Sequence, residues 1–217
     1  NDDKRNSLFM VGSGKITVPW VEGLTYELNY SNTLLNSSIN SFYPVTVPGG
    51  SGNKGRAYKD PSEERNWIVN NIVTYLRSFG QHQVNATLLY SRENRNYQSS
   101  HIDAQGFDNP VLGYNNVGLG TQFAVGSNAW EENSLSYMAR LNYTFMNRYL
   151  LTATWRRDGF SGFGPDKKFA NFPSVSLGWV LSDESFMQSI PKVYLKLRTS
   201  YGENGNQGIG RYSSFSR

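Results

Sequence analysis

The sequence predicts an all-β protein, an antiparallel sheet that forms a segment of a transmembrane β-barrel. Three observations predict this fold. Apolar and polar residues alternate with a period of two along several segments, as they do in strands with one apolar and one polar face. Short and long connections alternate between these segments. Hydrophobic residues make up only 38% of the 217 residues, although 14% of the residues are aromatic.

About eight strands follow from the alternating segments. The clearest segment is 133–146, in which Leu141, Tyr143 and Phe145 alternate with polar residues. Side chains at positions i and i+2 of a strand share one face, so this pattern separates an apolar from a polar face. The expected strands cover approximately 7–18, 23–34, 66–79, 82–91, 133–146, 148–158, 172–181 and 192–202.

The connections between these strands differ in length in a regular way. Three of them, at 19–22, 80–81 and 146–148, are short, and 182–191 is longer than a tight turn and departs from the rule. In an antiparallel sheet every second connection emerges at the same end, which predicts extracellular loops at one end and periplasmic turns at the other. The connections expected as extracellular loops are 35–65, 92–132 and the intermediate 159–171.

The two faces of the predicted sheet have different expected surroundings. The face with Leu151, Ala153 and Trp155 is expected to contact lipid, and the face with Thr152 and Thr154 is expected to line a wet lumen. Charged side chains on the second face are expected to pair with other charges of the lumen or of a plug, and less often with substrate. These lumen-facing charges are Glu27, Arg140, Arg156, Lys196 and Arg198.

Composition argues against several classes of protein. The chain has no cysteine, which excludes disulfides, cysteine-ligated zinc and thiol catalysis. The net charge of +4 could favour an anionic surface, but its Lys and Arg residues are scattered, which does not indicate nucleic-acid binding. His82 and His101 have no ligand partners at useful spacing. We therefore expect no metal or other cofactor, and no arrangement of Ser, His and Asp indicates an enzyme.

Ring and amide side chains in the expected extracellular loops are candidate substrate contacts. Rings stack on the faces of sugars, and amide groups both donate and accept hydrogen bonds. The same rings could instead pack the loops against one another. The candidates are Tyr43, Phe107, Tyr114, Asn115, Asn116 and Trp130.

Three blocks of sequence resemble one family, the SusC-like TonB-dependent outer-membrane transporters of Bacteroidetes-type bacteria. The blocks are LSYMARLNYTFMNRYLLTATWRRDGFSGFG (135–164), FPSVSLGWVLSDESFM (172–187) and LKLRTSYGENGNQGIGRY (195–212), in the order found in the family. Weaker likenesses at 21–30 and 67–90 extend the resemblance over nearly the whole chain. The departures from the family's pattern lie in expected loops, at Phe160, Gly162, Glu203 and Asn204.

The resemblance implies that residues 1–217 all belong to a β-barrel of about 22 strands, with the plug domain and the terminal strands outside this chain. It implies import of oligosaccharides or other large nutrients across the bacterial outer membrane, without a cofactor. The implied partners are the TonB complex, a SusD-like surface lipoprotein, the lipid of the outer membrane and a glycan or peptide substrate, but no nucleic acid.

Two alternatives remain open at the level of the sequence. A soluble β-rich carbohydrate-binding module would show the same alternation, because the strands of a β-sandwich also have one buried face. It requires the apolar faces of two sheets to meet in a core. A passive outer-membrane channel would share the barrel but would lack a plug.

Overall fold

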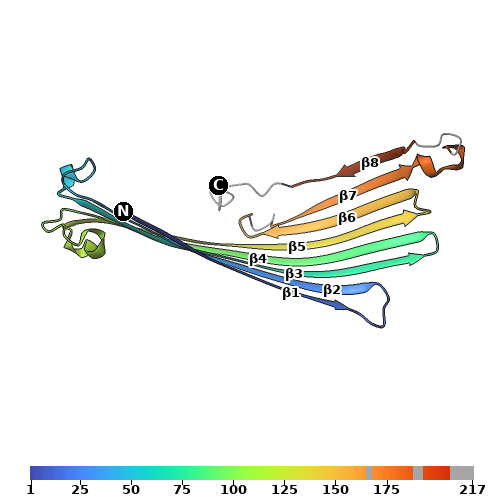
Figure 1. Cartoon of the computed structure of the whole chain (residues 1–217), viewed down its shortest axis with the longest axis horizontal. Coiled ribbons are helices and arrows are strands. Elements are labelled where there is room, and N and C mark those ends of the chain that lie inside the picture. The colour runs from blue at the N-terminus through green and yellow to red at the C-terminus, as the bar shows by residue number, and fades with distance from the viewer. Residues whose placement is uncertain (165–167, 188–192, 206–217) are drawn as a thin grey trace. The chain divides into compact units, whose positions relative to one another are not determined.

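The computed structural model describes residues 1–164, 168–187 and 193–205, and these form one eight-stranded sheet whose strand order follows the chain. Short 3-10 helices lie in the connections, and no helix of the described residues is long and apolar enough to cross a membrane. The strands are β1 (Asp2–Thr17), β2 (Leu24–Tyr43), β3 (Arg56–Phe79), β4 (His82–Gln105), β5 (Gln122–Phe145), β6 (Tyr149–Phe160), β7 (Phe169–Val180) and β8 (Lys196–Gly202) (Figure 1). The predicted all-β fold is confirmed.

The long strands extend well beyond their predicted ends. The loops expected at 35–65 and 92–132 are therefore wrong over most of their length, because the connections cover only 44–55 and 106–121. The reason is visible in the stretch SNTLLNSSINS (31–41), which belongs to β2. A period-two signal needs one apolar and one polar face. Where both faces of a strand carry polar residues, the strand gives no such signal.

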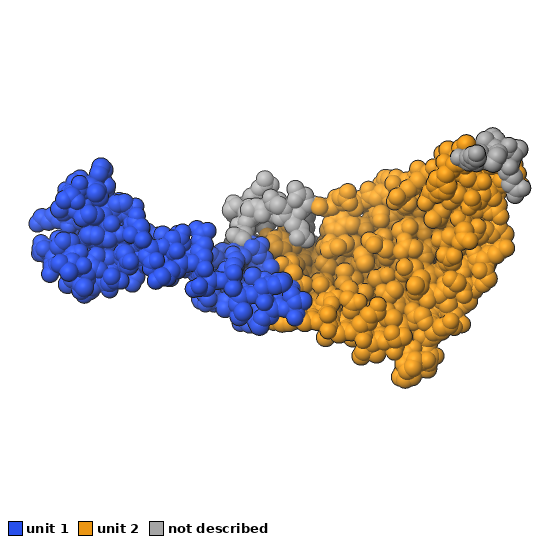
Figure 2. Space-filling model, viewed as in Figure 1, with its two compact units in different colours: residues 1–11, 31–67, 94–132 blue, residues 12–30, 68–93, 133–217 orange. Residues whose placement is uncertain are grey.

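The chain divides into two compact units (Figure 2). Unit 1 comprises 1–11, 31–67 and 94–132. Unit 2 comprises 12–30, 68–93 and 133–217.

Unit 2 has the apolar face that the sequence predicted. The register places Phe145 opposite Tyr149, Tyr149 opposite Trp179 and Trp179 opposite Leu197, so one row of apolar side chains crosses four strands. These side chains remain partly exposed: Tyr149 is 41% exposed, Trp179 37% and Leu197 54%. Such a continuous apolar surface is typical of the lipid-facing side of a barrel, with aromatic residues near the strand ends.

The opposite face of unit 2 is polar. Asn142 lies opposite Thr152, and Thr152 lies opposite Ser176, which in turn lies opposite Ser200. Thr152 Oγ1 donates a hydrogen bond of 2.9 Å to Asn142 Oδ1. This row is therefore polar across four strands, as expected of a wall that faces water.

The core expected of a soluble module is not found in the part of the chain that the structure describes. The described strands form a single sheet, so no second sheet among the described residues covers the apolar face. Buried hydrophobic side chains are few, and they are Ala57, Ala104, Phe107 and Val180. A domain of this length normally buries a far larger apolar surface. The structure does not support the soluble alternative.

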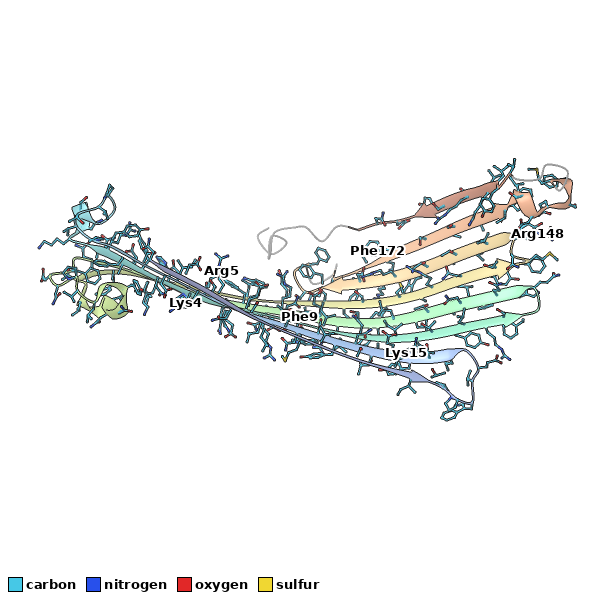
Figure 3. The ribbon with its side chains drawn as sticks, viewed as in Figure 1. Lys4, Arg5, Phe9, Lys15, Arg148 and Phe172 are labelled. Carbon is cyan, nitrogen blue, oxygen red and sulfur yellow. The ribbon has the colours of Figure 1, made fainter. Side chains whose placement is uncertain are left out.

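The connection after β7, which the sequence marked as an exception, is fastened to the sheet by Glu184. Its carboxylate accepts hydrogen bonds from Tyr149 Oη at 2.6 Å, Trp179 Nε1 at 2.9 Å and Arg148 Nη1 at 2.9 Å. Arg148 lies in the turn between β5 and β6 (Figure 3). The donors, with Tyr149 first among them, hold the pKa of Glu184 below its ordinary value. The described part of this connection, 181–187, is thus held against the turn end of the sheet.

Candidate ligand-binding surface

All six ring and amide residues that the sequence singled out lie in unit 1, but two of them are not in loops. Tyr43 is the last residue of β2, and Trp130 lies inside β5. Their predicted placement in extracellular loops was therefore wrong, since β2 extends to Tyr43 and β5 runs through Trp130. The other four lie in the connection 106–121: Phe107, Tyr114, Asn115 and Asn116.

Phe107 packs two loops together in this structure. It is only 4% exposed, and its ring meets the edge of Phe42 with 5.5 Å between centroids. Ala57 and Ala104 are fully buried beside it, and Tyr114 packs against the same cluster. Phe107 therefore packs the loops against one another, which was the alternative to a substrate contact. Its ring is not available to a ligand in this conformation.

The connections 44–55 and 106–121 fold together into one small structure, which we call the cap. The N–H of Gly106 donates to the carbonyl oxygen of Asn53 at 2.8 Å and so joins the two connections. Gly106 has a φ of 76°, in the left-handed region that glycine adopts at no steric cost. An added Cβ there would lie 2.2 Å from Thr121 Oγ1. Glycine therefore suits this position, where the backbone turns and the two ends of the connection 106–121 lie close together.

Side chains on the other side of the sheet from the buried Ala57 form a separate group. Arg56 and Tyr58 flank Ala57 on β3, and strand alternation turns them away from it. The Arg56 guanidinium binds Asp103 through two hydrogen bonds, Nε to Oδ1 at 2.9 Å and Nη2 to Oδ2 at 2.6 Å. It also lies 4.4 Å from the centroid of the Tyr58 ring. The hydrogen bonds from Arg56 hold the pKa of Asp103 below its ordinary value, although burial opposes the shift.

Rings continue from Tyr58 to its neighbours on β2 and β4. Tyr43 meets Tyr58 edge-on, with 6.0 Å between centroids, and the His101 ring lies 6.1 Å from Tyr58. His101 Nδ1 also contacts the carboxylate of Asp60. Burial raises the pKa of Tyr58, so its hydroxyl stays protonated at neutral pH. This second group of side chains combines ring faces with hydrogen-bonding groups.

A third group of side chains joins β3, β4 and β5. The rings of Tyr97 and Trp130 stack with 5.4 Å between centroids and planes 15° apart. Arg95 lies 5.7 Å from the Trp130 ring, and its Nη2 donates to Glu64 Oε1 at 2.8 Å. Its Nη1 lies 3.8 Å from Glu132 Oε2. One guanidinium group is thus held between two carboxylates and an indole ring.

These three groups of side chains share one face of unit 1, because their residues on β3 are all even-numbered and their residues on β4 are all odd-numbered. Of these residues, only Tyr43 and Trp130 were predicted from the sequence as ligand contacts. The signal that could have found the others is the i, i+2 spacing of rings and charges. We name this surface the ring-and-charge face, and it comprises Tyr43, Arg56, Tyr58, Asp60, Glu64, Arg95, Tyr97, His101, Asp103, Trp130 and Glu132.

The predicted lumen charges belong to unit 2 and do not join this face. They are Glu27, Arg140, Arg156, Lys196 and Arg198. Arg140 Nε donates to Thr154 Oγ1 at 3.3 Å, and Arg156 Nε donates to Asp158 Oδ2 at 2.7 Å. Glu27 accepts a hydrogen bond from Asn29. Lys196 and Arg198 lie at exposed positions of β8. Within the described ranges, no group of three or more metal-binding side chains is present.

Replacing Asp103 by asparagine is expected to loosen the cap, because Arg56 would lose its charged partner. Hydrogen bonds to charged groups contribute about 2 kcal/mol, so the Gly106 amide should exchange hydrogen about 30-fold faster. Hydrogen exchange with mass spectrometry on the full-length protein measures this change. The exposed Asp108→Asn, in the same connection, is the control.

The Arg56–Asp103 pair also predicts that the stability of the cap depends on pH. The folded pKa of Asp103 lies below the unfolded value of about 3.9. Its stabilisation is therefore complete above that unfolded value and is lost as the pH falls through the lower folded pKa. Protection of the Gly106 amide should drop in acid in the wild-type protein and change less in Asp103→Asn. Equal acid sensitivity of the two proteins would contradict the assignment.

Comparisons with known proteins place this geometry in a family. No family model matches the chain. In sequence, the chain is 34% identical over 219 residues to TonB-dependent receptor SusC of Bacteroides thetaiotaomicron, across 96% of this chain and 21% of SusC. It is 32% identical over 202 residues to TonB-dependent receptor P39 of Formosa agariphila, across 92% of this chain and 20% of that protein. The chain therefore spans about a fifth of the length of these curated relatives.

Solved structures show the same fold. The structure of the RagAB peptide transporter matches with a TM-score of 0.85 and 21% identity, over 97% of this chain and 24% of that chain. The closed-closed state of the RagAB peptide importer matches with a TM-score of 0.78 and 23% identity, over 97% and 23% of the two chains. At these identities the likeness concerns the fold alone.

The likenesses agree with the sheet described above. The sequence likeness to SusC covers nearly the whole chain, and the fold match covers the same range. Unit 2 has one apolar and one polar face, as a barrel wall in a membrane requires. The predicted family, fold class and outer-membrane location are confirmed. The chain therefore belongs to the SusC-like TonB-dependent receptors, and its described strands form part of the wall of an outer-membrane β-barrel.

Proposed function

We propose that the complete protein imports an oligosaccharide across the bacterial outer membrane, in a process driven through TonB. This chain supplies part of the barrel wall and part of the surface that binds the ligand. The names of the relatives support the transport class, since SusC and its Formosa counterpart are TonB-dependent receptors. The plug domain, the TonB contact and the terminal strands lie outside residues 1–217 in this proposal.

The observation that carries the ligand contact is the ring-and-charge face. Its rings provide flat apolar surface, and its carboxylate and guanidinium groups provide hydrogen-bonding partners. Sugars need both, because each pyranose ring has an apolar face and a polar rim of hydroxyl groups. Ligand sites generally combine such rings with a few placed polar groups. Trp130 and Tyr43 keep their predicted role in this proposal, now as strand residues.

An oligosaccharide fits this face better than a peptide does. Recognition of an extended peptide uses pockets for alternate side chains or an open sheet edge. The ring-and-charge face, as defined above, contains no aliphatic side chain. The RagAB structures are named for a peptide transporter, but their likeness to this chain concerns the fold. Import of a peptide is the second candidate.

A SusD-like surface lipoprotein is the proposed partner at the cap. The cap carries apolar side chains that are exposed, with Val111 at 84%, Val45 at 52% and Leu112 at 48%. Exposed apolar side chains in a water-facing segment indicate contact with another protein. Asn115 and Asn116 lie in the same segment and remain candidate ligand contacts.

Uptake of labelled oligosaccharides by cells that produce the full-length protein tests the proposal. We expect uptake to depend on the protein and to stop when TonB is removed. Uptake that continues without TonB would indicate the passive channel instead. Purification of the full-length protein should also recover a surface lipoprotein, and repeated purification without one would contradict the partner.

A further inference from the structure

We propose that the ring-and-charge face selects ligands by their charge: it accepts uncharged or amine-bearing oligosaccharides and rejects polyanionic ones, such as uronate-rich or sulfated chains. The inference rests on the proposed function, because it requires that the ligand contacts this face. It names the class of substrate and the side chains that determine it.

The guanidinium groups of this face are already engaged by carboxylates. Arg56 makes a two-point contact with Asp103, whose side chain is only 8% exposed. Arg95 is held by Glu64 at 2.8 Å and lies 3.8 Å from Glu132. Recognition of a carboxylate or sulfate on a sugar normally uses an arginine fork that is free to bind it. Here each fork would have to leave a protein carboxylate first.

Carboxylates also outnumber the fixed cations of the face. Its four carboxylates are Asp60, Glu64, Asp103 and Glu132, and its guanidinium groups are those of Arg56 and Arg95. His101 contacts Asp60, and even when it is protonated the face stays negative. A surface of one sign repels ligands of the same sign and attracts those of opposite sign.

The two other cations that β3 contributes to unit 1 do not reverse this balance. Lys59 and Arg65 lie on β3 at odd-numbered positions, so strand alternation turns them to the other side of the sheet. The whole chain has a net charge of +4, which by itself would favour anionic ligands. The arrangement of the charges in unit 1 therefore points to the opposite preference from the composition.

The test uses the purified full-length protein with its lipoprotein partner and three hexasaccharide probes. The probes are a glucosamine hexamer, its N-acetylated uncharged form and a galacturonate hexamer. Calorimetry at low salt should show binding of the first two and binding of the galacturonate hexamer that is at least about tenfold weaker, since contacts between like charges are unfavourable. The difference should shrink in 0.5 M salt, because salt screens charges on an exposed face.

A matched pair of double variants locates the effect. Glu64→Gln with Glu132→Gln removes two negative charges from the face, both of them next to Arg95, so binding of the galacturonate hexamer should rise about tenfold. Glu63→Gln with Glu131→Gln removes the same charge from neighbouring residues that alternation places on the other side of the sheet. This second pair should leave the preference unchanged.

The outcomes separate this inference from the proposed function. TonB-dependent uptake without any charge preference, or equal effects of the two double variants, would overturn the inference and leave the proposed function standing. No binding of any of the hexamers to the wild-type complex would overturn the inference and also the oligosaccharide assignment.

Discussion

Replacing Val175 by arginine is expected to block insertion of the full-length protein into the outer membrane, whereas the same change at the adjacent Ser176 is expected to be tolerated. Val175 is 43% exposed on the apolar face of β7 and lies opposite Ala153. It is four residues from Trp179, which corresponds to about 13 Å along a strand. That depth is near the centre of an apolar band about 25 Å tall, where arginine costs about 2–4 kcal/mol.

Ser176 is the matched control for this experiment. It lies one residue away, opposite Thr152 on the polar face, so an arginine there would point into water. The measurement is the amount of heat-modifiable full-length protein in isolated outer membranes. Equal amounts for both variants would mean that the two faces are assigned incorrectly. Loss of both would mean that β7 tolerates no long side chain at this level.

Replacing Trp130 by alanine is expected to weaken ligand binding about tenfold, the loss typical of a central aromatic contact. Trp130 stacks on Tyr97 and lies beside Arg95, so its removal takes away a ring face and disturbs the neighbouring guanidinium. Trp130→Phe keeps a ring at this position and should recover most of the binding. The measurement is the dissociation constant of the best-bound hexasaccharide.

Trp20→Ala is the control for loss of a tryptophan. Trp20 is 84% exposed in the turn between β1 and β2, at the opposite end of β2 from Tyr43. It should bind ligand as the wild-type protein does. Binding by Trp130→Ala equal to that of wild type would remove the ring-and-charge face from the proposed site. Equal loss in Trp130→Phe and Trp130→Ala would assign Trp130 to packing.

Strand alternation explains why the membrane part of this fold was predictable. Along β5 and β6 each apolar residue has a polar neighbour, so Tyr143 and Leu151 were assigned to the same face, and the register places them opposite each other. The turns at 80–81 and 146–148 were also located correctly. Lipid on one side and water on the other impose this contrast on the sequence.

The outer parts of the long strands were not predictable in the same way. From Ser31 to Tyr43, and from Arg56 to Trp67, both faces carry polar side chains, and the pattern that identifies a strand is absent. Phe107 illustrates the second difficulty. An aromatic ring in an expected loop is a candidate ligand contact, but the ring of Phe107 is buried against Phe42 of β2. This contact forms only when the cap folds, so the sequence does not reveal it.

The amino-acid sequence by itself determined the fold class, the family and the lipid-facing side of the wall. These depend on contrasts between neighbouring residues and on long local motifs, which a single chain displays directly. Only the tertiary structure decided which charges neutralise one another. Arg56 binds Asp103, which lies 47 positions away in the chain, and Arg95 binds Glu64, which lies 31 positions away. Such pairs form because hydrogen bonding between strands brings distant residues side by side, and no local pattern records them.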